Sequence, residues 1–195
     1  IPVYIDGMIW DINSIHTAYP DFLNNKIKLL TFQDKNPFTS EIFSHVGSPQ
    51  ERKQVVEGGP CVVLATSGML VGGASVEYLK EFSSNEKNAL IFVCYQGAGT
   101  LGRQVQDGLD SVRMVVDGKE EIVKINMEIH TAKGMTSHAG RNELMNFFRN
   151  ISPKPKRAII VHGEVSKSLD LASSLYKLSR IETNVPRILE TIKLK

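Results

Sequence analysis

The 195-residue chain lacks any apolar run near the roughly 18 residues that a membrane-spanning helix needs. It also lacks a signal peptide, internal repeats and low-complexity tracts. We therefore expect a cytoplasmic protein with no membrane partner. With 42% hydrophobic residues, the chain can bury a core and can hold one domain or parts of two. It begins at Ile1 rather than Met, so we expect a processed or truncated product.

Cysteine and net charge are both scarce. The two cysteines, Cys61 and Cys94, lie in apolar runs without Cys-x-x-Cys spacing, which argues against a cysteine zinc site and for buried free thiols. The formal charge of +2 neither requires nor excludes a nucleic-acid partner, because a near-neutral total can include a local basic groove.

A clustered set of metal ligands is also missing, but two histidines stand out. His138 lies in Thr-Ser-His-Ala and His162 in Val-His-Gly-Glu, each between a strand-like and a helix-like segment. A rigid scaffold places ligands and proton donors at such junctions. A zinc centre needs three or four protein ligands, so this chain resembles one part of a larger site. We interpret His16, His45 and His130 as structural or surface residues.

The first part of the chain alternates strand-like and helix-like segments. Continuous apolar runs at Cys61–Thr66 and Asn88–Tyr95 predict strands covered on both faces. This order favours a parallel α/β sheet with right-handed crossovers. The other predicted elements are a strand at Pro2–Ile5 and helices at Met8–Tyr19, Arg52–Glu57, Ser75–Phe82 (capped by Ser75) and about Leu101–Leu109.

After Ser111 the pattern changes to short alternating strands, which favours antiparallel pairing. We place a boundary between residues 111 and 130. The elements predicted here are strands at Val112–Val116, Glu121–Ile125, Met127–Ile129 and Arg157–His162, helices at Asn142–Asn150 and from Ser166 or Ser168 to about Leu178, and a weak edge strand at Arg187–Leu194.

Residues Gly97 to Gly102 match the dinucleotide fingerprint GxGxxG, with Asp117 about 20 residues further on. The following helix is short, however, and strands precede the motif. A second glycine loop, at Ser67–Gly73, follows the neighbouring strand and should open at the same sheet edge. Two adjacent loops suit an extended phosphate backbone as well as a dinucleotide. The glycines could also serve only to permit tight turns.

Four segments in order resemble one family: Leu64–Met69 with Gly72-Gly73, Gly99–Arg103, Ser137–Ala139 and Val161–Glu164. They are similar to motifs of the β-CASP nucleases, metallo-β-lactamase-fold enzymes that cut RNA, and most of all to archaeal homologues of the cleavage and polyadenylation specificity factor. The resemblance extends over nearly the whole chain. It implies a parallel Rossmann-like β-CASP sheet over residues 1–128, then the C-terminal return segment of a metallo-β-lactamase αββα domain over 129–195.

The resemblance also implies roles for individual residues. His162 corresponds to a histidine that ligates one of two zinc ions, and His138 to a catalytic histidine beside the scissile phosphate. The RNA-phosphate contacts would come from Ser67, Gly68, Thr100, Arg103 and Ser137. The family's His-x-His-x-Asp-His run is absent, and we expect it upstream of Ile1. Gly140 stands where the family often has an acidic residue, which makes the role of His138 less secure than that of His162.

The sequence therefore predicts part of a zinc-dependent ribonuclease that hydrolyses RNA phosphodiester bonds in RNA 3′-end processing or decay, as an endonuclease or a 5′-to-3′ exonuclease. We expect the isolated chain to be inactive and zinc to be absent from it or weakly bound. A homodimer through the C-terminal segment is a further expectation. The alternatives are a non-catalytic module that binds RNA or a partner and, third, a dinucleotide-binding domain.

Overall fold

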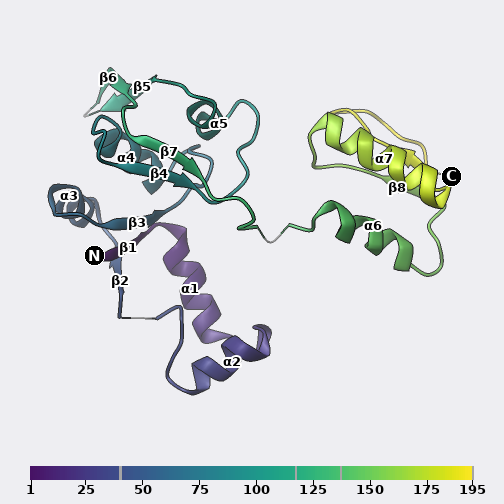
Figure 1. The fold of residues 1–195 in the computed structure, drawn as a ribbon, viewed down its shortest axis with the longest axis horizontal. Helices are drawn as coiled ribbons and strands as arrows, with labels where there is room; N and C mark the ends of the chain where they lie inside the picture. The colour runs from purple at the N-terminus through teal and green to yellow at the C-terminus, as the bar shows by residue number, and fades with distance from the viewer. Residues whose placement is uncertain (40, 117, 137, 195) are drawn as a thin grey trace. The chain divides into compact units, whose positions relative to one another are not determined.

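The computed structural model describes residues 1–39, 41–116, 118–136 and 138–194, and it consists of two compact units, residues 1–136 and 137–195 (Figure 1). Each unit has its own hydrophobic core. The predicted domains, 1–128 and 129–195, stay a prediction. Strand β7 (Glu128–Thr131) pairs with β4 (Ala89–Phe92) inside the first unit.

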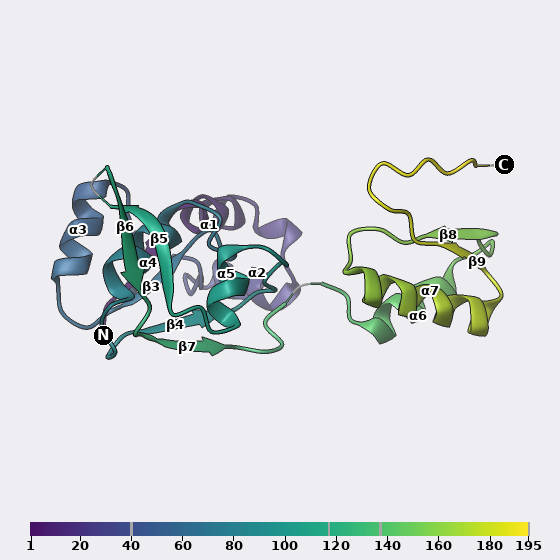
Figure 2. The ribbon, with the colours of Figure 1, turned by 90° about the horizontal axis from the view of Figure 1, so that it is seen from above.

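The first unit is built on parallel strands, which confirms the predicted α/β class. Strand β1 (Val3–Asp6) pairs in parallel with β2 (Phe43–Val46) on one side and β3 (Val62–Ala65) on the other. Strands β4 and β7 are also parallel and lie side by side in Figures 1 and 2. Strand β2 was not predicted, because its four residues include the polar pair Ser44-His45 and show no clear pattern.

Local side-chain caps start several helices. Asn24 accepts a hydrogen bond from the amide of Ile27, and Ser48 accepts one from Glu51. The prediction that Ser75 caps a helix is wrong: Gly73 is the N-cap, and Ser75 donates to the carbonyl of Ser67. The helices of this unit are α1 (Met8–Ala18), the 3-10 helix η1 (Pro20–Phe22), α2 (Asn25–Phe32), α3 (Pro49–Glu57), α4 (Ala74–Phe82) and α5 (Leu101–Gln106).

Only one face of β3 is well covered in this unit. Val63 and Ala65 pack against a core cluster that includes Val55 of α3 and Tyr78 of α4. The prediction of strands covered on both faces is wrong for the described residues, because alternate side chains on the other face remain open. Their exposed fractions are 47% for Val62, 38% for Leu64 and 57% for Ile91 on β4.

Strands β5 (Ser111–Val116) and β6 (Lys119–Lys124) form the predicted antiparallel hairpin (Figure 2). The antiparallel prediction is wrong for the next strand, β7, which pairs in parallel with β4. After the hairpin, the amides of Asn126 and Met127 both donate to the carbonyl of Ser83. Met127 is buried in the core, and this anchor turns the chain alongside β4.

The second unit packs two helices against a pair of short parallel strands. Its core consists of Met145, Ala158, Leu175 and Ile181. The expected caps at Ser166 or Ser168 are wrong, because α7 begins after Glu164 and Ser168 is buried within it. Its elements are α6 (Arg141–Asn150), β8 (Arg157–Ile159), α7 (Val165–Ser179) and β9 (Glu182–Asn184).

The predicted edge strand at Arg187–Leu194 is also wrong, since these residues, all described, form no strand. The amide of Glu190 donates to the carbonyl of Arg187, and the Glu190 carboxylate accepts from the Arg187 amide. This turn satisfies backbone groups that a strand would use for pairing. None of the helices in the described part of the chain is long and apolar enough to cross a membrane.

Candidate functional site

The first glycine loop follows β3 and is closed by its own hydrogen bonds. The Ser67 amide donates to the carbonyl of Gly72 (3.2 Å), and Ser67 Oγ accepts from the Val71 amide (2.9 Å). The Ser75 hydroxyl donates to the Ser67 carbonyl from the first turn of α4 (2.7 Å). Gly73 has φ of 75°, a conformation that favours glycine. The loop is therefore a defined turn between strand and helix.

The second glycine loop follows β4 and leads into α5. Thr100 is the N-cap: its Oγ1 accepts from the Arg103 amide (3.2 Å) and donates to the Gly97 carbonyl (2.8 Å). Gly99, with φ of 83°, provides the left-handed residue of the turn. Since capping already uses the Thr100 hydroxyl, this residue shapes the loop.

The two loops contact each other, but the prediction that they open at one sheet edge is wrong, because β3 belongs to the sheet β2-β1-β3 and β4 pairs with β7 in another. The Gly102 amide donates to the carbonyl of Met69 (3.0 Å). The Cys94 thiol lies 3.4 Å from the carbonyl of Gly68, within hydrogen-bond distance. Ser67 and Gly68 thus belong to the same surface region as Thr100.

Cys94 corrects another expectation, because it is exposed rather than buried. Cys61 is half-buried, and burial raises the pKa of its thiol. Both cysteines are free.

The dinucleotide reading does not agree with the topology. A dinucleotide fold needs the strand after the glycine-rich turn and its helix to join the same parallel sheet. Here β5 pairs antiparallel with β6, and the neighbour of β4 is β7. Helix α5 has only six residues. Asp117, the acidic residue that completes the fingerprint, lies outside the described residues. Gly102 instead permits close packing of the two loops.

Arg103 lies in α5, directly after the second loop, and its side chain is partly exposed. Its Nε donates to the carboxylate of Asp107 one turn later (2.8 Å). The exposed fractions of the two side chains are 40% and 60%, so the pair is a surface ion pair and is worth at most about 1 kcal/mol. A phosphate could replace Asp107 at small cost.

His138 is exposed and lies two residues before Gly140, the N-cap of α6. Glycine has no side chain with which to cap the helix, and the amide of Gly140 instead donates to the carboxylate of Glu143 (2.7 Å). An acidic charge thus stands in the first turn of α6 even though Gly140 replaces the family's acidic residue. Ser137, the predicted phosphate donor, lies outside the described residues.

His162 is exposed and lies between β8 and α7 in a left-handed backbone conformation, with φ of 64°. Non-glycine residues adopt this conformation rarely, and often at functional sites. Gly163 supports it, because a Cβ there would lie 2.6 Å from Ser168 Oγ. Ser168 is buried within α7, so the chain must pass close to the helix at Gly163. The turn that carries His162 is therefore held by packing.

The described residues do not by themselves complete a metal centre. They contain no group of three or more histidine, cysteine, aspartate or glutamate side chains that could hold a metal ion. His162 would provide at most one ligand of the three or four that zinc requires. The other histidines have partners: His16 packs on Phe38, His45 on Trp10, and His130 pairs with Glu128.

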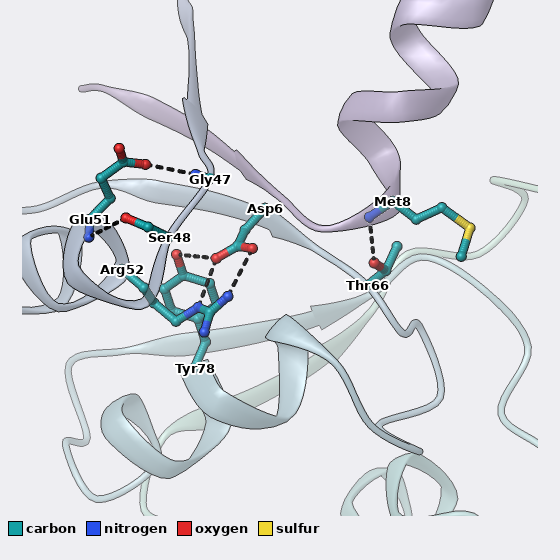
Figure 3. A network of polar contacts seen from close by, with 8 residues as sticks. All are labelled: Asp6, Met8, Gly47, Ser48, Glu51, Arg52, Thr66 and Tyr78. Carbon is teal, nitrogen blue, oxygen red and sulfur yellow. Dashed lines mark hydrogen bonds and ion pairs between the residues drawn. The ribbon is translucent and has the colours of Figure 1, made fainter.

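A buried polar network, which the sequence did not reveal, supports the sheet edge next to the first loop (Figure 3). Asp6 ends β1 and is 3% exposed; its carboxylate accepts two hydrogen bonds from Arg52 (2.8 and 3.1 Å) and one from the Tyr78 hydroxyl (3.0 Å). The hydrogen bond to Asp6 raises the pKa of Arg52. Burial, followed by the charge of Asp6, raises the pKa of Tyr78.

The network continues to the first glycine loop through the backbone. Immediately after Asp6 and Gly7, the amide of Met8 donates to Thr66 Oγ1 (3.2 Å), as Figure 3 shows. Thr66 precedes Ser67, so the same edge carries both the anchored end of β1 and the start of the loop. In the sequence, the only indication of this network is an aspartate, Asp6, at the end of an apolar segment.

Two known families match parts of this chain. The family described as the Beta-Casp domain matches residues 1–105, and the one described as the Zn-dependent metallo-hydrolase RNA specificity domain matches residues 122–186. The chain belongs to the β-CASP family, because the first match covers more than half of it. The predicted resemblance is confirmed.

Among characterised proteins, the chain is similar to archaeal proteins named transcription termination factor FttA. It is 48% identical over 198 residues to that of Pyrococcus horikoshii, 48% over 198 residues to that of Thermococcus kodakarensis and 47% over 197 residues to that of Methanocaldococcus jannaschii. Each alignment covers 100% of this chain but only 30–31% of the relative. The chain thus spans less than a third of the length of these relatives.

Proposed function

We propose that this chain is part of a metal-dependent ribonuclease that hydrolyses RNA phosphodiester bonds. Membership of the β-CASP family and the match to an RNA specificity domain support an RNA substrate. The relatives' name supports action on transcripts at termination, a setting compatible with the expected role at RNA 3′ ends. The cytoplasmic location and the homodimer stay predictions.

The observation that carries this proposal is the setting of His162. An exposed imidazole stands on a left-handed residue that is fixed by the contact between Gly163 and Ser168. This arrangement suits a side chain that must point in one direction, such as a metal ligand. His162 would then be one donor to a zinc ion whose other donors come from the rest of a longer protein.

In this proposal, His138 holds a proton near the leaving oxygen of the scissile phosphate and donates it as the bond breaks. His138 is exposed and lies shortly before α6, which supports this role by leaving the imidazole accessible to a phosphate. Ser137 remains a predicted phosphate donor.

The two glycine loops would bind the RNA backbone. Ser67 Oγ accepts a bond from the Val71 amide, and a hydroxyl can combine that role with donation to a phosphate oxygen. Arg103 would exchange Asp107 for phosphate. Backbone contacts of this kind carry little sequence information, so we expect low sequence selectivity.

The test is a ribonuclease assay on the full-length protein with labelled RNA. His138→Ala and His162→Ala should each abolish cleavage, whereas the matched control His130→Ala, which changes an exposed histidine on β7, should cleave normally. Near-normal cleavage by His162→Ala would remove it from the catalytic set. RNA binding without any cleavage by the unaltered protein would favour the non-catalytic alternative.

A further inference from the structure

Gln96 is an amide side chain buried between the two glycine loops, with only 2% of its surface exposed. It follows β4 and precedes Gly97, the first residue of the second loop. Its Nε2 donates to the carbonyl of Gly68 in the first loop (2.8 Å) and to the carbonyl of Cys94 (3.3 Å). One side chain thus joins the backbone after β3 to the backbone after β4.

The glycines of both loops leave room for this contact. A Cβ at Gly102 would lie 1.9 Å from Gln96 Oε1 and 2.8 Å from the Met69 carbonyl oxygen. A Cβ at Gly68 would lie 2.6 Å from Cys94 Sγ. A side chain at Gly102 would push the loops apart, because backbone atoms of Met69 block it, whereas one at Gly68 would displace the Cys94 side chain. The distance between the two loops is therefore set by direct contacts between them, from Gly102 to Met69 and from Gln96 to Gly68.

The hydrogen bonding of Gln96 indicates a positional role more than a stabilising one. Its Oε1 is buried and accepts no hydrogen bond from the described part of the chain. An unpaired buried acceptor costs free energy, which offsets much of what the Nε2 bonds contribute. An apolar residue of the same length should therefore keep most of the stability but lose the link to Gly68.

We infer that Gln96 is a positioning residue that holds the two loops at the separation at which both bind the backbone of one RNA strand. The inference rests on the proposed RNA binding by these loops. Gln96 itself is buried and does not touch the RNA. It acts through Gly68, Ser67 and the helix that carries Arg103, so its loss should weaken binding by both loops together.

The experiment compares Gln96→Met with Gln106→Met in the whole chain. Gln106 is a matched control, because its Nε2 donates to Thr131 Oγ1 (2.9 Å) and ties α5 to β7 without touching the first loop. The probe is fluorescein-labelled single-stranded oligouridine. Fluorescence anisotropy over a salt series gives the dissociation constant and the number of phosphate contacts.

We expect Gln96→Met to bind about tenfold more weakly and to lower the salt slope by about one contact, with a melting temperature close to that of the control. A local readout comes from Cys94, whose Sγ lies 3.5 Å from Gln96 Nε2. In a Cys61→Ala background, RNA should slow the reaction of the Cys94 thiol with a maleimide, and Gln96→Met should reduce this protection. A second variant, Gly102→Ala, forces the loops apart while keeping the amide and should also weaken binding.

The outcomes separate the two proposals. If the unaltered chain neither binds oligouridine nor shows protection of Cys94, RNA binding by the loops is wrong. If the unaltered chain binds oligouridine, but Gln96→Met and Gly102→Ala bind it as tightly as the unaltered chain does, the positioning role is wrong. Equal losses of affinity in Gln96→Met and Gln106→Met would also overturn it, since a general structural effect would then explain both.

Discussion

The carboxylate of Asp6 and the guanidinium of Arg52 form a two-point hydrogen bond, with distances of 2.8 and 3.1 Å, that joins the end of β1 to α3. Their side chains are 4% and 24% exposed, so the pair is largely shielded from water. Removing one charge from such a pair leaves the other buried and unpaired.

We expect Asp6→Asn to lower the free energy of unfolding of the first unit by about 3 kcal/mol. Urea denaturation followed by circular dichroism would measure the loss. Glu57→Gln, which breaks the exposed pair between Lys53 and Glu57, is the control and should change stability by less than about 0.5 kcal/mol. An equally small change in Asp6→Asn would mean that the network contributes little.

The raised pKa of Tyr78 should make the free energy of unfolding of the first unit depend on pH in the alkaline range. Its pKa is raised in the folded protein, so an unfolded chain loses the phenol proton at lower pH than the folded chain does. The contribution of this group is fully present below about pH 10, the pKa of an unperturbed tyrosine, and is lost as pH rises toward the folded pKa.

Tyr78→Phe should remove this component. The variant should be less stable at pH 8 by about 1 kcal/mol, because the hydrogen bond to Asp6 is lost. Its stability should then fall less steeply than that of the unaltered chain between pH 9.5 and 11.5. Parallel slopes for the two proteins, measured by urea denaturation at each pH, would show that Tyr78 does not contribute.

Gly163→Ala should destabilise the second unit by about 2 kcal/mol, because the new methyl group would overlap Ser168 Oγ. The double variant Gly163→Ala/Ser168→Ala should recover most of that loss, since the hydroxyl is removed. Thermal unfolding of both variants measures the coupling. Ser173→Ala, at an exposed position of α7, serves as the control. If the double variant is instead destabilised by the sum of the two single changes, the overlap between the new methyl group and Ser168 does not cause the loss.

Substitutions of Arg103 and of Asp107 should have opposite effects on RNA affinity, because the two side chains form an ion pair. Arg103→Gln should weaken binding of oligouridine and lower the salt slope by about one. Asp107→Asn should strengthen binding a few-fold, because the carboxylate no longer competes with phosphate for Arg103. Anisotropy titrations at two salt concentrations measure both. A loss of affinity in Asp107→Asn would contradict competition.

The sequence predicted three of the parallel strands of the first unit, β1, β3 and β4, because each is a clear apolar segment. It placed the two glycine loops at one sheet edge, whereas the structure brings them together through the hydrogen bond from Gly102 to Met69, with β3 and β4 in different sheets. The placement of β7 could not be predicted, because short strands look alike whether their partner lies before or after them. The anchor of Asn126 and Met127 on Ser83 decides that pairing.

The polar contacts of the site were harder to predict. Serines before helices were read as caps, yet Ser75 bonds to the preceding loop and Ser168 packs against Gly163. Gln96 and Arg52 had no distinguishing local pattern, since each acts on a residue distant in sequence. The positive φ of His162 was not predicted either; it lies beside the close approach of Gly163 to Ser168 of α7.

The exposed aliphatic side chains of β3 and β4 have a practical consequence for purified material. Val62, Leu64 and Ile91 present aliphatic groups to water, and exposed aliphatic side chains on strands promote self-association. Sedimentation and scattering of the isolated chain should therefore vary with its concentration. Binding titrations should use the isolated chain at micromolar concentrations or lower, so that self-association is not mistaken for RNA binding.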